Sequence, residues 1–230
     1  MAGSVHPRAR LDLILLALGL LALAAPWIAW ARLRWLERRS GRALLVRGVT
    51  GDQAARIVLL RAELDRMPVD EGMGFLGDGY AAHLPAVRLS PGTYLGRTLF
   101  AAVRAARVAC HAVQHRDGDR GAARLARLEG VAMLWGNLWP AAVLLALLSP
   151  GKPGSLRALA ALAAGMFVLQ VVSHATVAAA ARRARRELDG ARLLDGHPEA
   201  EVADALEASR LDHLSIPARR SLWGALRRRD

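Results

Sequence analysis

Three long apolar runs, separated by arginine-rich stretches, dominate the pattern of hydrophobic and polar positions along the chain. They cover residues 13–31, 131–148 and 158–181, and none of them contains a charged residue. Each is close to the roughly 20 residues that a membrane-spanning helix needs. The Pro- and Gly-rich stretch at 150–157 predicts a turn between the second and third runs. The pattern therefore predicts three transmembrane helices, the last two forming a hairpin.

Two other interpretations of these runs stay open. The first run could be a cleaved signal peptide, because Ala22-Leu23-Ala24 resembles a small-x-small cleavage site. The arginines in RLRWLERRSGR at 32–42 resist export and favour an uncleaved anchor. The second and third runs could form a buried hairpin of a soluble protein, but their length and lack of charge favour the membrane.

The distribution of positive charge predicts the orientation of the three spans. Arginines are dense after the first and third runs, whereas the loop between the second and third runs carries Lys152 and Arg157. Because positive residues stay on the cytoplasmic side, the N-terminal segment 1–12 is expected outside. Residues 32–130 then form a cytoplasmic domain, and residues 182–230 form a cytoplasmic, basic, helical tail.

Composition narrows the class of protein further. The chain is 53% hydrophobic with a formal net charge of +12, and its apolar residues are clustered, which is typical of a membrane protein. The aromatic and glycine motifs of RNA-binding modules are missing, so no nucleic-acid partner is expected. Cys110 is the one cysteine, which excludes an intramolecular disulfide and a multi-cysteine zinc site.

The cytoplasmic segment is predicted to be mainly α. Thr50 is a good N-cap for a helix with Asp52 in its first turn. Residues 86–90 alternate as a short strand does, and at most a short strand pair is expected. A long helix is predicted to begin at Ser90, with Pro91 in its first turn. The helical pattern is more regular from Arg97 onward, because glycines interrupt its start.

The second half of that helix carries a candidate metal site. Arg107, His111 and His115 follow one another in steps of four and therefore share one helix face. Two histidines at this spacing can hold one metal ion, although a chance pair without metal is the other reading. Asp117, Asp119 or His83 could supply a third ligand, as a zinc site needs at least three.

Three stretches resemble the bacterial neutral zinc metallopeptidase family of small membrane proteins. They are GVTGDQAARIVL from Gly48, DGYAAHLPAVRLSPGTYLGRTLFAAVRAARVACHAVQHRDG from Asp78, and FVLQVVSHATVAAAARRARREL from Phe167. The similarity runs over about residues 48–186, with a looser match through the first span. It implies a zincin-like cytoplasmic domain, a bacterial inner-membrane location and zinc-dependent proteolysis.

The resemblance also implies that the catalytic site of this chain is degenerate. The family pattern AAHE.GHA.QH falls on residues 105–115, which places Arg107 at the first ligand histidine and Val108 at the catalytic glutamate. His111 matches the second ligand, and Ala112 follows it. The later pattern PVEF.AS.RA places Val177 at the third ligand. An arginine cannot release its proton to bind zinc, and valine cannot activate water.

The sequence therefore predicts a non-proteolytic pseudopeptidase with no catalytic residues and no cofactor. It would bind a protein or peptide, or assemble with an active peptidase relative. One alternative is an active zinc peptidase whose site is rebuilt around His111 and His115. A second is a structural membrane protein that binds anionic lipid through its basic tail, where residues 217–230 carry Trp223 among arginines. His174, inside the third run, is expected to hydrogen-bond within the bundle.

Overall fold

The computed structural model of the protein describes residues 7–72, 77–148 and 153–219. The chain is mainly helical, as predicted for the fold class, and it also has a small three-stranded sheet. The helices are α1 (Pro7–Ser40), α2 (Gly51–Arg61), α3 (Pro91–Tyr94), α4 (Leu99–Arg116), α5 (Arg120–Leu147), α6 (Pro153–Gly190), α7 (Glu199–Leu214) and α8 (Ile216–Arg219). The strands are β1 (Val69–Glu71), β2 (Gly79–Ala81) and β3 (Ala86–Leu89).

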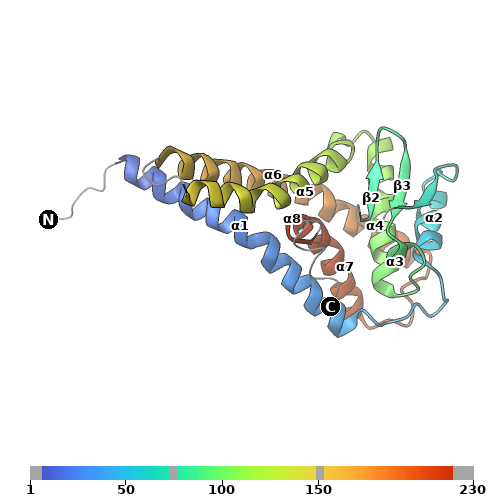
Figure 1. Cartoon of the computed structure of the whole chain (residues 1–230). Helices are drawn as coiled ribbons and strands as arrows, with labels where there is room; N and C mark the ends of the chain where they lie inside the picture. The colour runs from blue at the N-terminus through green and yellow to red at the C-terminus, as the bar shows by residue number, and fades with distance from the viewer. Residues whose placement is uncertain (1–6, 73–76, 149–152, 220–230) are drawn as a thin grey trace.

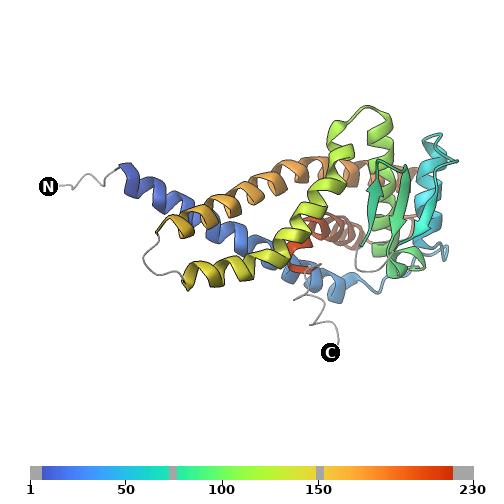
Figure 2. The same cartoon turned by 45° about the horizontal axis from the view of Figure 1, so that its top comes forward.

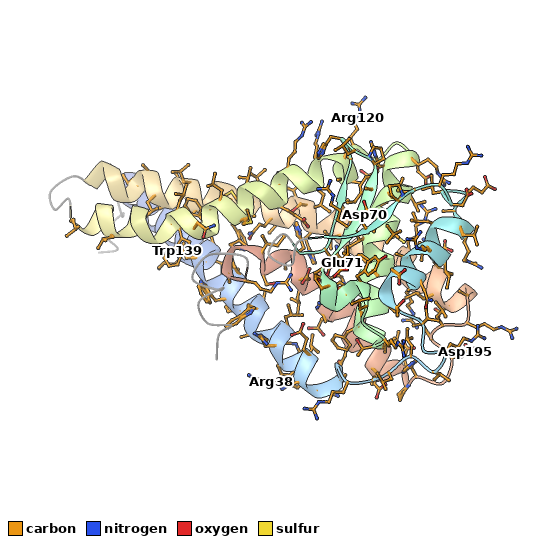
Figure 3. All side chains as sticks on the ribbon, turned by 45° about the vertical axis from the view of Figure 1, so that its right-hand side comes forward. Arg38, Asp70, Glu71, Arg120, Trp139 and Asp195 are labelled. Carbon is orange, nitrogen blue, oxygen red and sulfur yellow. The ribbon has the colours of Figure 1, made fainter. Side chains whose placement is uncertain are left out.

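The molecule has a slender end and a broad end (Figure 1). The N-terminal part of α1, the C-terminal part of α5 and the N-terminal part of α6 run together at the slender end, with the α5–α6 hairpin visible in Figure 2. The broad end holds the sheet with α2, α3 and α4. In Figure 3, Trp139 lies on the slender end, while Arg120 and Asp195 lie on the broad end. The apolar runs and the polar segments of the sequence thus occupy different ends of the fold.

The sheet has the strand order β1-β3-β2, with β1 parallel and β2 antiparallel to β3. The predicted strand at 86–90 is confirmed as β3, but the expected limit of one strand pair is wrong. Val69 pairs with Val87 through a parallel contact between segments that are far apart in the chain. A three-residue strand has too few alternating positions to be recognised from its sequence, so tertiary packing decided this pairing.

Helix α4 lies at the centre of the broad end and packs against α2, α6 and α7. The predicted helix from Ser90 is divided in two. Ser90 caps the single turn of α3, and the side chain of Thr98 caps α4 by accepting a hydrogen bond from the backbone N–H of Ala101 at 3.2 Å. Between them the carbonyl of Gly96 accepts a hydrogen bond from Gly51 N–H at 2.9 Å, which ties this break to the start of α2.

The N-terminus of α2 agrees with its prediction. Thr50 occupies the N-cap with an extended backbone, and its N–H donates to the side-chain oxygen of Gln53 at 3.0 Å. Asp52 lies in the first turn, where a carboxylate stabilises the helix dipole.

The segment predicted as a basic tail packs into the body of the molecule. Helix α7 forms where a helix was expected, with Pro198 at its N-cap, and it contacts α1, α4 and α6. On its outer side Arg32 of α1 contacts Glu207 at 2.9 Å, and Ser40 donates to Asp204 at 2.7 Å. The part of the tail from 220 to 230 lies outside the described residues, as do residues 150–152 of the predicted hairpin turn, whose remaining residues 153–157 begin α6.

One helix in the described part of the chain is long and apolar enough to cross a membrane. It covers Arg157–Gly190 of α6, and only 22% of its most apolar 18-residue stretch is buried inside the protein. The predicted first and second spans lie within α1 and α5, and their insertion in a membrane stays a prediction. Large apolar side chains are exposed on all three of these helices, among them Ile28 (64%), Leu138 (54%) and Val172 (65%).

Candidate functional site

The face of α4 that carries Arg107 and His111 is closed to solvent. Arg107 is 2% exposed and His111 is 1% exposed, because α6 and α7 cover this face. Nη1 of Arg107 lies 3.2 Å from Nε2 of His111, one helical turn away. Nδ1 of His111 lies 2.9 Å from Oε1 of Gln114, and the amide nitrogen of Gln114 donates to the carbonyl of Thr176 on α6 at 3.3 Å. These bonds form one chain from α4 to α6.

The bonding partners of His111 define its protonation state. Burial, reinforced by the neighbouring Arg107 cation, lowers the pKa of His111 to about 3. The neutral ring therefore accepts the Arg107 N–H at Nε2 and donates its own proton from Nδ1 to Gln114. The Nε2 lone pair, which a metal ion would use, is directed at a guanidinium.

Asp212 of α7 supplies the negative charge at this site. Its carboxylate is 1% exposed and lies 3.7 Å from Nη2 of Arg107. Nε of Arg104 lies 4.0 Å away from it, and Arg219 of α8 also contacts it. Arg104 in turn donates to Glu37 of α1 at 3.0 Å. The result is a buried ionic cluster that connects α1, α4, α7 and α8.

His115, the second candidate metal ligand, has a different partner. Its Nδ1 lies 2.8 Å from the hydroxyl of Tyr80 on β2, and the two rings are tilted with centroids 5.6 Å apart. The structure thus places His111 in the buried network and His115 at the sheet, each with its own hydrogen-bond partner.

The three candidates for a third metal ligand lie in separate settings. Asp117 is exposed and pairs with Arg183 at 2.7 Å, while Asp119 caps α5 through the N–H of Gly121 at 2.7 Å. His83 is exposed in the turn between β2 and β3. Across residues 7–72, 77–148 and 153–219, no group of three or more His, Cys, Asp or Glu side chains is arranged to hold a metal ion.

The two valines that the resemblance aligns with the family's catalytic positions are core residues. Val108 and Val177 are both 0% exposed, one on α4 and the other on α6, whose helices pack together. His174 lines an apolar cavity of about 210 Å³ with Phe167 and Gln170. The Nδ1 atom of His174 has no hydrogen-bond partner among the described residues, so the bond expected for it within the bundle is not seen at this atom.

A second polar relay lies nearby, between α5, α6 and α7. Ser173 Oγ is 2.7 Å from Nε2 of His213, and Nδ1 of His213 is 3.3 Å from Oε1 of Glu129. This order of groups is that of a serine hydrolase triad. The Ser173 hydroxyl also bonds the carbonyl of Gln170 at 3.0 Å, and the adjoining cavity measures about 10 Å³, close to the space of one water. An acyl group does not fit there, so we interpret the relay as a link between helices.

Sequence reasoning missed the partners that come from outside α4. Asp212 and His213 were part of a helix assigned to the tail, and Glu37 and Glu129 were given no role. One signal was present: Asp212 follows Ala205 and Ala208 at helical spacing, so a carboxylate lies on a helix face of small side chains. A buried charge of this kind needs a partner elsewhere in the fold.

These features define a mainly helical protein whose central helix α4 carries two histidines. The chain belongs to the family described as "Putative neutral zinc metallopeptidase", whose model matches residues 13–215. Comparison with curated proteins and with solved structures finds no match for this chain.

Proposed function

We propose that this family member is a non-proteolytic membrane protein in which a buried arginine takes the place of the catalytic metal. The observation that carries the proposal is the 3.2 Å contact between Arg107 and Nε2 of His111, with Asp212 beside them. A zinc ion at Nε2 would need the space and the lone pair that the guanidinium uses, and two cations would repel each other there. The arrangement of Arg107, His111 and Val108 does not fit a catalytic zinc ion.

The alternative of a zinc site rebuilt around His111 and His115 would require several bonds to break. His111 would have to leave Arg107 or Gln114, and His115 would have to leave Tyr80 if zinc used its Nδ1. No aspartate or glutamate lies between the two histidines to act as a general base. The geometry therefore favours the non-proteolytic function.

With proteolysis lost and the scaffold kept, we propose that the protein binds another protein or a peptide, including an active relative of the same family. The face of α4 beside His111 is covered by α7, so a partner would bind elsewhere or would displace α7. Membrane integration through α1, α5 and α6 is part of this proposal, and it is supported by the exposed apolar side chains on these helices. Contact with anionic lipid is a second role, which the charge of the chain favours.

The decisive experiment measures zinc in the purified, detergent-solubilised full chain by elemental mass spectrometry. Wild type, His111→Ala and the exposed control His83→Ala are compared, and each is assayed for chelator-sensitive cleavage of casein. We expect zinc well below one per chain and no cleavage in all three. Stoichiometric zinc in wild type and His83→Ala, lost in His111→Ala, would refute the proposal.

The binding role has its own test. An affinity-tagged copy of this chain is co-expressed with an active family member that retains the His-Glu-x-x-His motif, and each is used to purify the other. Recovery of the pair in both directions supports assembly. Failure in both directions removes the active relative as the partner without changing the result of the zinc measurement.

A further inference from the structure

A polar hollow lies between α1 and α8, apart from the His111 site. It measures about 240 Å³. Its lining residues are Trp30, Leu33, Arg34, Glu37 and Arg219. The first four share one face of α1, because they follow one another at helical spacing. Arg219 of α8 faces them from the other side.

Positive charge exceeds negative charge around this hollow. Arg34 is exposed and lies over the ring of Trp30 at 5.7 Å, and no carboxylate pairs with it in the described residues. Glu37 is already engaged by Arg104 at 3.0 Å. Arg219 contacts Asp212, a carboxylate that Arg104 and Arg107 also approach.

The charges can be compared for the side chains that line the hollow. Two of them are guanidinium groups, those of Arg34 and Arg219, and one is a carboxylate, that of Glu37. Guanidinium groups in partly buried sites are stabilised by anions, and they bind phosphate through two parallel N–H bonds.

The hollow also lies at a defined height on α1. The uncharged run 13–31 ends just before Arg32, and Trp27 and Trp30 pack edge to face with centroids 6.0 Å apart. Tryptophan and arginine at the end of an apolar helix are typical of the membrane–water boundary. In a membrane, the hollow would therefore lie at the level of the lipid headgroups.

We propose that this hollow binds a phosphate group through Arg34 and Arg219, with Trp30 and Leu33 forming its apolar wall. The phosphate belongs either to an anionic lipid headgroup or to a soluble phosphate compound, and both present the same chemistry to the two guanidiniums. A bound phosphate links α8 to α1 and so holds Asp212 against Arg107. This site is independent of whether the chain binds zinc.

The test uses the full-length protein and Arg34→Gln, with Arg38→Gln as the matched control. Arg38 is exposed one turn further along α1 and lies at the outer edge of the molecule in Figure 3. Binding is measured by native mass spectrometry and by thermal stabilisation in three arms: phosphatidylglycerol, phosphatidylcholine and inorganic phosphate. Arg34→Gln alters an exposed side chain, so its fold should persist, and circular dichroism checks this.

We expect phosphate or phosphatidylglycerol to bind wild type and Arg38→Gln with equal affinity. Arg34→Gln should bind at least about tenfold more weakly, because a charged hydrogen bond is lost. Binding of phosphatidylglycerol alone identifies a lipid headgroup, and equal binding of inorganic phosphate identifies a soluble ligand. Equal binding of phosphatidylglycerol and phosphatidylcholine without any phosphate response, or equal losses in both variants, would overturn the proposal.

Discussion

Replacing Arg107 by methionine tests whether the buried guanidinium stabilises the fold. Methionine fills a similar length of space, so the main losses are electrostatic. The variant removes the ion pair with Asp212 at 3.7 Å and the hydrogen bond to Nε2 of His111 at 3.2 Å. Asp212 and the His111 lone pair then stay buried with fewer partners.

The expected destabilisation follows from burial. Removing one partner of a buried ion pair costs roughly 3–5 kcal/mol. Asp212 keeps Arg104 and Arg219, so we expect a loss near the lower limit, about 3 kcal/mol in the free energy of unfolding. Part of that loss comes from the His111 acceptor that no longer has a donor.

The matched control is Arg61→Met. Arg61 pairs with Glu187 at 3.0 Å, a shorter distance, but the two side chains are 43% and 22% exposed. Exposed pairs contribute below about 1 kcal/mol. Equilibrium unfolding of the detergent-solubilised chain, followed by tryptophan fluorescence, measures both variants. Equal small losses for Arg107→Met and Arg61→Met would show that the buried cluster does not stabilise the fold.

Three further predictions concern other parts of the broad end and the hairpin. The first concerns pH: an unfolded histidine takes up a proton near pH 6.5, whereas folded His111 stays neutral down to about pH 3. The contribution of His111 to the free energy of unfolding is therefore present above pH 6.5 and is lost as the pH falls towards 3, by up to about 1.4 kcal/mol per pH unit. The variant His111→Gln should flatten this slope when unfolding is measured against pH, and an unchanged slope would contradict the prediction. Burial raises the pKa of the Cys110 thiol to about 12, so a maleimide should label it only after denaturation, and rapid labelling of the native protein would be the opposing result. Gly136→Ala places a Cβ against the carbonyl of Pro217 and should destabilise the fold by about 1–3 kcal/mol. Gly130→Ala on the same helix meets open space and should be neutral or stabilising in thermal unfolding. A larger loss of stability for Gly130→Ala than for Gly136→Ala would show that α8 does not pack on α5.

Much of the fold could be predicted from local patterns. The apolar runs and the caps at Thr50 and Ser90 indicated helices because both signals depend on neighbours within one or two turns. The motif stretches indicated the family to which the chain belongs. The sheet was only partly predicted, since β1 has three residues and pairs in parallel with a distant strand.

The candidate site divides in the same way. From the sequence alone, helical spacing placed Arg107, His111 and His115 on one face of a helix, because that depends only on the period of the helix. The tertiary structure decided which partner each of them has: Asp212 for Arg107, Gln114 for His111 and Tyr80 for His115. Two of these partners come from α7 and β2, and their approach depends on how the whole chain packs, which no local pattern records.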